Sequence, residues 1–293
     1  MQGVLVVDKP PGMTSHDVVN QVRRMAKMRR VGHTGTLDPM ATGVLVLLLG
    51  SATRLARFIL SEDKQYFATL RLGISTTTYD AEGEITATHA VDVDRPAIER
   101  SLHRFRGNIL QVPPMYAAIR HEGKRLYELA REGKEVERKA RPVTLYRLDL
   151  VGWDPPDFTL DIECSSGTYI RSLAHDLGQV LGCGAHLTAL RRKTSGPFTL
   201  EQSYSLDTLE ELAREGRLEA ALLPSHTALE GMPVLQLTPE QEIAVGYGQT
   251  ITPDKPYTAE YVQARDSANE LIAVLVRLED SVYRPTIVLS PHL

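Results

Sequence analysis

The stretch GHTGTLDPMATGVL, residues 32–45, holds a single carboxylate, Asp38, in a loop of small residues, and an apolar run to Leu49 follows it. Glycine and threonine let a backbone turn tightly, and Pro39 restricts the residue before it to an extended conformation. The sequence therefore predicts an acid held in one pose beside a buried element. A structural role stays open as well, because Asp-Pro pairs commonly cap or turn the segment that follows.

The composition is that of an ordinary globular protein. The chain has 293 residues, 42% hydrophobic and 24% charged, which suits one large domain or one large domain and a small one. Its first residues, MQGVLVVDKPPG, lack the basic region of a secretory signal, and its longest apolar run, residues 44–49, is far shorter than the ~20 residues of a membrane helix. Two cysteines, Cys164 and Cys183, are too few and too far apart for a zinc site or a disulfide framework. We therefore expect a cytoplasmic monomer with two buried thiols, no membrane segment and no metal.

Charge is distributed unevenly along the chain. Residues 201–293 hold 15 acids and 6 basic groups, whereas residues 1–200 hold 22 acids and 27 basic groups. The net charge of −4 thus hides a basic larger part and an acidic tail. This asymmetry predicts that the larger part meets a polyanion while the acidic tail stays away from it.

A basic helix is predicted near the N-terminus. In TSHDVVNQVRRMAKMRR, residues 14–30, apolar residues recur at helical spacing behind a Ser or Thr cap. No acid occurs between residues 18 and 33, so no i,i+4 ion pair offsets the repulsion among the basic side chains. Two interpretations of this basic face are therefore equally good: contact with phosphates, or an ordinary solvated surface. The candidate phosphate contacts here are Arg23, Lys27, Arg29 and Arg30.

Strand and helix patterns mix without regular alternation, which predicts an α+β fold with a mixed or antiparallel sheet. KQYFATLRLG, residues 64–73, alternates as a strand, and EITATHAVDV, residues 84–93, is predicted to be its hairpin partner. From residue 233 onward the pattern changes to short strands broken by Gly and Pro. We place a domain boundary near residue 231, followed by a small β-rich module.

A long excursion is predicted over residues 111–141. It starts at a proline pair and continues as basic, glycine-punctuated sequence, QVPPMYAAIRHEGKRLYELAREG. Such a segment could close over a ligand, and a solvated helical hairpin is the alternative. Its candidate phosphate contacts are Lys124 and Arg125.

A lone catalytic acid needs a group that keeps it ionised and aimed, and an arginine does both. SSGTYIRSL, residues 165–173, places Tyr169 and Arg171 where a predicted strand ends and a helix begins. Tyr66, near the start of the strand at residues 64–73, is either a core aromatic or a ring that stacks on a base.

Four separated stretches together resemble one family. LVVDKPPGMTSHDVV, RRVGHTGTLDPMATGVLVLLLGSATR, KQYFATLRLG with TTTYDAEGE, and SSGTYIRSLAHDLG with GAHLTALRR are similar to TruB-type tRNA pseudouridine synthases. The similarity runs from about residue 3 to residue 200, and residues 111–133 resemble the thumb loop of the bacterial members.

The resemblance implies a fold and a reaction. The fold would be a pseudouridine synthase catalytic domain over residues 1–230, with the thumb-like insertion at 111–141, and a PUA-type RNA-binding module over 231–293. The reaction would convert uridine to pseudouridine at position 55, in the T stem-loop of tRNA, without guide RNA and without a cofactor. A non-catalytic tRNA-binding or chaperone protein on the same scaffold is the alternative. A hydrolase would need a further nucleophile, for which no motif is present.

The resemblance also implies roles for single residues. An aspartate in such a site acts as a nucleophile at C1′ or C6, or abstracts the C2′ proton, and the sequence leaves these open. The target base must leave its stack, and stacking on an aromatic ring offsets part of that cost. By resemblance, Asp38 is the catalytic residue, Tyr66 stacks on the base, Arg171 pairs with Asp38, Tyr169 and Leu190 line the pocket, and His33 enters the T loop.

Overall fold

The computed structural model describes residues 1–60, 62–117, 119–121, 123–254, 257–278 and 281–289. Contacts between residues divide the chain into two compact units. Unit 1 comprises Met1–Asp38, Val44–Ser61 and Pro197–Leu293, and unit 2 comprises Pro39–Gly43 and Glu62–Gly196. The domain boundary expected near residue 231 falls inside unit 1. That residues beyond it form an independent module stays a prediction.

Unit 1 is built around a short N-terminal sheet. Strand β3 is a neighbour of β1, and β2 pairs antiparallel with β3 so that His33 lies opposite Leu47. The chain returns to this sheet after residue 196, because Val7 bridges to Tyr204 and Val4 bridges to Leu223. The elements of this part are β1 (Gly3–Lys9), α1 (Ser15–Met25), β2 (Val31–His33), β3 (Thr42–Leu49), α2 (Ala56–Leu60), β13 (Phe198–Thr199) and α6 (Leu206–Arg214), with 3-10 turns η1 (Gly50–Leu55), η2 (Leu200–Gln202), η3 (Leu218–Ala221) and η4 (Ser225–Leu229).

Helix α1 begins as the sequence predicts. Thr14 is the N-cap: its side chain accepts a hydrogen bond from the Asp17 backbone N–H, and the Asp17 carboxylate accepts one from the Thr14 N–H. This reciprocal capping satisfies N–H groups that the first turn otherwise leaves without partners. The buried face of α1 carries Val18, Val19 and Val22.

The C-terminal part of unit 1 is a four-stranded sheet, which confirms the β-rich prediction. The strand order is β14 (Val234–Gln236), β15 (Tyr261–Arg265), β16 (Leu271–Arg277), β17 (Tyr283–Val288), and α7 (Pro239–Gly246) precedes β15. Tyr283 is fully buried and its hydroxyl donates to the carbonyls of Tyr257 and Ala259 at 3.2 and 3.0 Å. Val274 belongs to the same hydrophobic cluster as Val46 of β3, which explains why the contacts group this sheet with the N-terminal segments.

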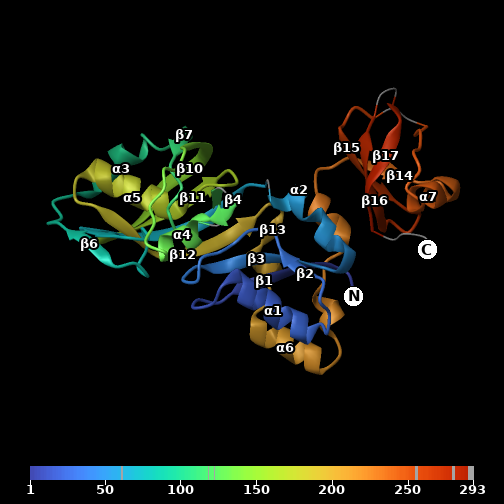
Figure 1. The fold of residues 1–293 in the computed structure, drawn as a ribbon, viewed down its shortest axis with the longest axis horizontal. Coiled ribbons are helices and arrows are strands. Elements are labelled where there is room, and N and C mark those ends of the chain that lie inside the picture. The colour runs from blue at the N-terminus through green and yellow to red at the C-terminus, as the bar shows by residue number, and fades with distance from the viewer. Residues whose placement is uncertain (61, 118, 122, 255–256, 279–280, 290–293) are drawn as a thin grey trace. The chain divides into compact units, whose positions relative to one another are not determined.

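Unit 2 is an antiparallel sheet with helices packed on it (Figure 1). The strand order is β12-β4-β11-β10-β7, and α3 packs on β10 while α5 packs on β12. The mixed α+β fold is as predicted. The elements are β4 (Lys64–Leu72), β5 (Ile74–Thr76), β6 (Ile85–Thr88), α3 (Arg95–Leu102), β7 (Gly107–Gln111), β8 (Arg120–His121), β9 (Lys124–Arg125), α4 (Leu126–Arg131), β10 (Arg141–Asp154), β11 (Asp157–Cys164), α5 (Ile170–Leu181) and β12 (Ala185–Ser195).

The predicted hairpin between residues 64–73 and 84–93 is wrong. β6 pairs with the short strand β5 in a separate two-stranded sheet, while β4 pairs with β11 and β12. Gly73, with a φ of +85°, redirects the chain between β4 and β5. Such a backbone conformation favours glycine and ends the continuous alternation on which the prediction relied.

The structure explains why position 43, after the loop that carries Asp38, is a glycine. It opens β3, where Thr42 and Gly43 pair in parallel with Arg191 and Arg192 of β12. Its φ is +99°, and a Cβ at this position would lie 2.2 Å from the Arg192 carbonyl oxygen. Only glycine fits so close a backbone approach.

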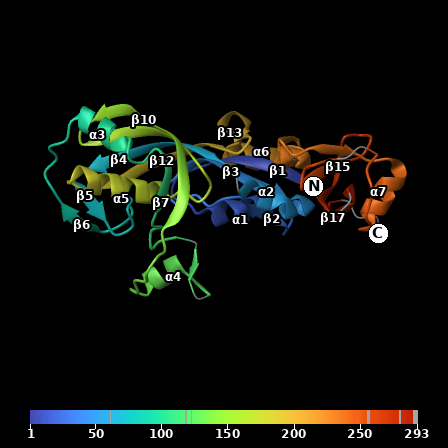
Figure 2. The same ribbon diagram turned by 90° about the horizontal axis from the view of Figure 1, so that it is seen from above.

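Residues 111–141 leave the sheet of unit 2 as an excursion that holds β8, β9 and α4 (Figure 2). β8 and β9 pair antiparallel as a two-residue ladder, and most residues between 132 and 141 are exposed. The chain re-enters the sheet at β10, where Arg141 lies opposite Gln111 of β7. The two ends of the excursion are therefore neighbours.

Candidate functional site

The loop of Asp38 is fastened to the start of α1 by Ser15. The Ser15 hydroxyl accepts a hydrogen bond from the Leu37 N–H at 2.8 Å and donates to the Leu37 carbonyl at 3.2 Å. Ser15 is 2% exposed and Leu37 is 3% exposed, so both groups are shielded from water. The residue next to Asp38 is thus fixed, and the half-buried carboxylate is held on a rigid backbone. Sequence reasoning identified Ser15 only as a helix cap and missed this role.

His33 lies five residues before Asp38, at the end of β2. Its ring Nδ1 accepts a hydrogen bond from the Gly35 N–H at 3.3 Å. The following residue, Thr34, donates its backbone N–H to the Val46 carbonyl at 3.0 Å. His33 and Asp38 therefore lie at the two ends of one short loop, both in unit 1.

The basic residues of α1 and the segment after it divide into two groups. Arg23 turns inward, because its guanidinium donates to the Val31 carbonyl at 2.9 Å and to Asn20 Oδ1 at 3.1 Å. Lys27, Arg29 and Arg30 are exposed. The inward direction of Arg23 gives it a structural role that a charge run in the sequence could not reveal.

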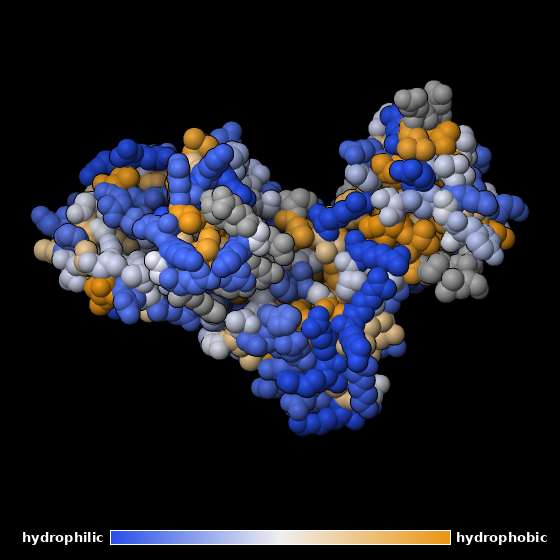
Figure 3. Space-filling model, in the orientation of Figure 1, coloured by the Kyte–Doolittle hydropathy of each residue, from blue (hydrophilic) through white to orange (hydrophobic). Residues whose placement is uncertain are grey.

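An open pocket at the end of α1 is lined by Arg24, Lys27 and Arg29, and Arg23 also contributes to its wall. A second pocket, between α1 and α6, is lined by Arg24 and Lys27 together with Glu210 and Arg214 of the acidic C-terminal third. Figure 3 shows a strongly hydrophilic surface over α1 and α6. Arg214 pairs there with Glu210 at 2.6 Å, so the acidic segment brings both a cation and a carboxylate beside the basic helix. The expectation that the acidic segment stays away from a polyanion stays a prediction.

In unit 2, β4 presents Tyr66 on the buried face of the sheet. Tyr66 is 8% exposed, and its neighbours across the strands are Ile162 of β11 and Arg192 of β12. Leu190, 7% exposed, lies opposite Ala68 on the same face. The structure thus brings the predicted stacking tyrosine and the predicted pocket leucine onto one face, in diagonal positions where large side chains meet.

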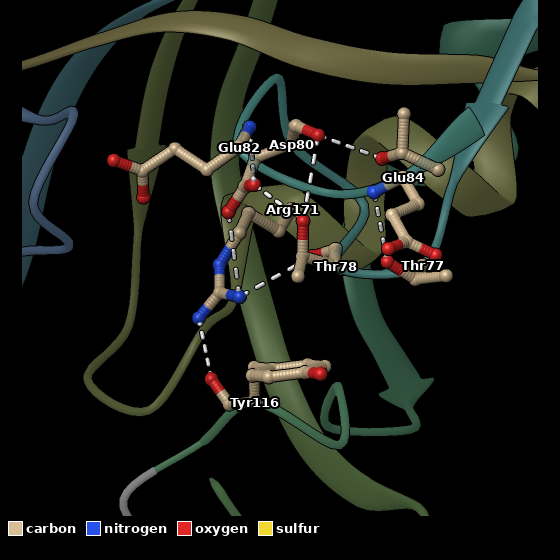
Figure 4. Close-up of polar contacts among 8 residues, drawn as sticks. Thr77, Thr78, Asp80, Glu82, Glu84, Tyr116 and Arg171 are labelled. Atoms are coloured by element: carbon tan, nitrogen blue, oxygen red, sulfur yellow. Dashed lines mark hydrogen bonds and ion pairs between the residues drawn. The ribbon is translucent and has the colours of Figure 1, made fainter. Parts of the chain in front are cut away.

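Arg171 lies in the first turn of α5 and is 5% exposed. Its Nη1 donates to the Thr78 carbonyl at 3.3 Å and lies 3.5 Å from Asp80 Oδ2, and its Nη2 donates to the Tyr116 carbonyl at 2.8 Å (Figure 4). The Asp80 side chain is only 4% exposed. A buried ion pair of this kind needs such additional hydrogen bonds to offset the loss of water.

Asp80 is a functional candidate that sequence reasoning missed. Its carboxylate also accepts hydrogen bonds from the Thr78 hydroxyl and from the Glu82 N–H (Figure 4). The Thr76 hydroxyl donates to the Asp80 carbonyl at 2.7 Å. In the sequence, Asp80 lies between the two strands of the expected hairpin and looks like an ordinary turn residue, although the threonines before it indicate local side-chain hydrogen bonds. The expected pairing of Arg171 with Asp38 stays a prediction, since Asp38 belongs to unit 1.

Tyr169 is the N-cap residue of α5, and Gln111 holds its backbone. The Tyr169 N–H donates to Gln111 Oε1 at 2.8 Å, and Gln111 Nε2 donates to the Tyr169 carbonyl at 3.0 Å. The Ser172 hydroxyl donates to the Val112 carbonyl at 2.8 Å. Gln111 is 2% exposed and carries no charge, so nothing in the sequence signalled it.

The candidate phosphate contacts of the excursion are only partly described. Lys124 is exposed, and its Nζ donates to Glu132 Oε1 at 3.1 Å. The Arg125 backbone lies in β9, whereas its side chain lies outside the described part of the structure. An exposed pair of this kind contributes little to stability and exchanges readily for another anion.

Two properties of the described residues bear on cofactors and membranes. No group of three or more His, Cys, Asp or Glu side chains among them could hold a metal ion, and none of the helices formed by these residues is long and apolar enough to cross a membrane. Cys164 and Cys183 are buried free thiols. Burial raises the pKa of the Cys164 thiol to about 11, so it is an unreactive core residue.

The fold is shared with proteins of known structure. The chain matches the crystal structure of a Cbf5-Nop10-Gar1 complex with a TM-score of 0.76 and 26% identity, covering 99% of this chain and 87% of that one. It also matches the structure of an H/ACA RNP bound to a substrate RNA containing 2′-deoxyuridine, with a TM-score of 0.75, 26% identity and coverage of 99% and 85%.

Sequence comparison is more specific. Residues 23–170 match the TruB family pseudouridylate synthase N-terminal domain, and residues 171–230 match the tRNA pseudouridylate synthase B C-terminal domain. The chain is 47% identical to tRNA pseudouridine synthase B of Pseudomonas aeruginosa over 94% of its length and 91% of that protein. It is 43% identical to the protein of the same name from Pasteurella multocida, with 97% and 94% covered. The chain belongs to the TruB family of pseudouridylate synthases.

Proposed function

We propose that this chain isomerises uridine to pseudouridine in tRNA, that its target is position 55 in the T loop, and that Asp38 is the catalytic residue. The observation that carries the proposal is the 47% identity over 94% of the chain with a protein named tRNA pseudouridine synthase B. The fixed loop of Asp38 is the second support, because a catalytic acid must be held in a defined direction.

The reaction breaks the N1–C1′ bond of uridine, rotates the base and joins C5 to C1′. The C5 proton is lost to solvent, and N1 takes up a proton. Asp38 would serve as the nucleophile at C1′ or C6, or as the base that takes the C2′ proton. Substrate and product are isomers, so the reaction requires neither a redox cofactor nor a group donor. Arg171 would keep the Asp38 carboxylate ionised and aimed.

The flipped base is the natural occupant of the face that carries Tyr66 and Leu190. An aromatic ring there would recover part of the few kcal/mol that unstacking costs. Tyr169, held by Gln111, would line the same pocket. His33, at the other end of the Asp38 loop, would enter the T loop and fill the space left by displaced bases.

Recognition of the tRNA would use exposed basic groups that release counterions from its phosphates. We assign this role to Lys27, Arg29, Arg30 and Lys124. Arg23, whose guanidinium donates to the Val31 carbonyl, would support the segment that holds the first three. Arg125 remains a candidate by its place in the sequence. We further propose that the enzyme is a cytoplasmic monomer that works without metal or guide RNA, and that residues 231–293 form a PUA-like RNA-binding module.

The test is tritium release from C5-labelled uridine in an unmodified tRNA transcript, with a transcript that has cytidine at position 55 as the control. Release from the first transcript and not from the second supports the proposal. Tight binding of both transcripts without release would favour the alternative of a non-catalytic tRNA-binding or chaperone protein. Equal release from both would place the target elsewhere in the tRNA.

A further inference from the structure

The loop at residues 76–83 touches α5 at two points that are one helical turn apart. The first is Arg171, which donates a hydrogen bond to the Thr78 carbonyl and pairs with the Asp80 carboxylate. The second is His175, whose ring stacks on that of Tyr79 with a centroid separation of 4.0 Å and an interplanar angle of 13°. Tyr79 lies between the two residues that Arg171 contacts, so the stack acts at the centre of this contact.

Tyr79 has an unusual backbone conformation. Its φ is +65°, in the left-handed region that bulky side chains rarely adopt and that costs of order 1–3 kcal/mol. The Tyr79 N–H donates to the Thr76 carbonyl at 3.3 Å, and the Tyr79 carbonyl accepts from the Leu187 N–H at 3.0 Å. Such strain persists only where the surroundings over-determine it, and it gathers at functional sites.

His175 contributes the face of its ring. Its Nδ1 is buried and has no hydrogen-bond partner among the described residues, so this nitrogen does not explain the position of the side chain. Burial, helped by the positive charge of Arg138, lowers the pKa of His175, so the ring is neutral near pH 7. A neutral imidazole packs against a phenol ring much as another aromatic side chain would.

We propose that Tyr79 and His175 form a positioning clamp, which holds residues 76–83 on α5 so that Thr78 and Asp80 keep the Arg171 guanidinium in its working orientation. The inference rests on the proposed function, because Arg171 is the residue through which the clamp reaches the catalytic acid. Neither clamp residue needs to touch the substrate. Loss of the clamp is therefore expected to slow the chemical step and to leave the affinity for tRNA unchanged.

The experiment compares truncation with ring-preserving substitution in the full chain. Tyr79→Ala and His175→Ala should lower the single-turnover rate on tRNA by about 10- to 100-fold, the range expected for a misplaced catalytic group, with the Kd for tRNA changed by less than about 3-fold. Tyr79→Phe and His175→Phe should restore the rate to within about 3-fold of wild type. His89→Ala, an exposed histidine of the same unit, is the matched control and should have no effect.

Three outcomes of this comparison overturn the clamp. They are wild-type rates in both alanine variants, a His175→Phe rate as low as that of His175→Ala, or a rate loss matched by an equal loss of tRNA affinity. A double variant adds a positive test. If the clamp acts through Asp80, then His175→Ala should lower the rate of an Asp80→Asn protein by less than about 2-fold, since the two changes remove one shared function. A full additional loss would contradict it.

Amide hydrogen exchange keeps the clamp testable if the wild-type chain shows no activity, a result that would refute the proposed function alone. Exchange at residues 76–83 should speed up in His175→Ala and stay at the wild-type rate in His175→Phe, with the rest of unit 2 unchanged. Equal exchange in all three proteins would refute the clamp whatever the activity. Faster exchange throughout unit 2 would show a general loss of packing and would refute it as well.

Discussion

Gln111 and Tyr169, 58 positions apart, exchange two hydrogen bonds through the Gln111 amide and the Tyr169 backbone. The amide occupies the place of a neighbouring strand, donating and accepting as a backbone would. It ties the last residue of β7, where the excursion at 111–141 starts, to the residue that precedes α5. The excursion and the helix that carries Arg171 therefore share one anchor.

We expect Gln111→Ala to destabilise the protein by about 1–3 kcal/mol, because two backbone groups lose their partners in a shielded place. Gln111→Glu should cost a similar amount, since a carboxylate cannot donate to the Tyr169 carbonyl. Urea unfolding measures both, with the exposed Gln179→Ala on α5 as the control. A Gln111→Ala protein as stable as this control would show that the anchor is dispensable.

Asp38→Asn should abolish isomerisation and leave tRNA binding intact. The amide is nearly isosteric with the carboxylate, yet it acts neither as a nucleophile nor as a base. Single-turnover tritium release and a tRNA binding titration check the two halves of this expectation. Asp92→Asn, at an exposed position, is the control. Turnover within ~100-fold of wild type would count against the assigned role.

Arg171→Lys should lower kcat on the order of 100-fold and change tRNA affinity by only a few-fold. The guanidinium serves three groups at once, the carbonyls of Thr78 and Tyr116 and the Asp80 carboxylate, whereas an ammonium on a flexible stem cannot span them in one plane. Rates and binding constants of the variant decide this. A lysine variant with the wild-type kcat would mean that charge alone suffices at this position.

Binding of tRNA should weaken as salt rises, and Arg29→Gln with Arg30→Gln should flatten the log–log slope by about 1–2. The control pair is Arg95→Gln with Arg100→Gln on α3, which should leave the slope unchanged. Arg214 is unsuitable as a control, because it lines a pocket with Arg24 and Lys27. Equal slopes in the two double variants would show that Arg29 and Arg30 do not contact the tRNA phosphates.

Lys64 should make stability depend on pH in an alkaline window. Burial, helped by the positive charge of Arg192, lowers the pKa of Lys64 from 10.5 to about 8. Between these values the unfolded chain holds a proton that the folded chain has lost, so stability rises with pH across the window. At about 1.4 kcal/mol per pH unit, the penalty of charged Lys64 below pH 8 is on the order of 3 kcal/mol.

Lys64→Met tests this, because methionine keeps an unbranched chain without a charge. Its free energy of unfolding should exceed that of wild type near pH 7, and the difference should shrink between pH 8 and 10.5. Urea unfolding at several pH values gives both curves. Parallel curves throughout would mean that Lys64 keeps its ordinary pKa in the folded protein.

The elements that local chemistry specifies were predictable from the sequence. Thr14 caps α1 through Asp17, and Gly182 ends α5 in the left-handed conformation with a φ of +78°. Both features depend on residues within a few positions of one another, so a pattern records them. The alternation in residues 64–73 predicted β4 for the same reason.

The parts that could not be predicted depend on contacts between distant residues. Asp80 meets Arg171 across 91 positions, and Gln111 meets Tyr169 across 58. Neither pair leaves a local pattern, because each partner alone looks like an ordinary turn or strand residue. The inward direction of Arg23 is similar: its partner Val31 lies in β2, and a row of positive charges does not show which member bonds a backbone carbonyl.

The N-terminal strand is completed by residues made much later. Val7 bridges to Tyr204 and Val4 to Leu223, while residues 62–196 between them form the bulk of a separate unit. At a ribosomal rate of about 5–20 residues per second, β1 waits roughly 10–30 s after residue 61 is joined before residue 223 is available. Unit 2 can therefore fold while the first strands of unit 1 are still incomplete, and a stalled nascent chain that ends before residue 200 would expose the apolar edge of β1 to chaperones.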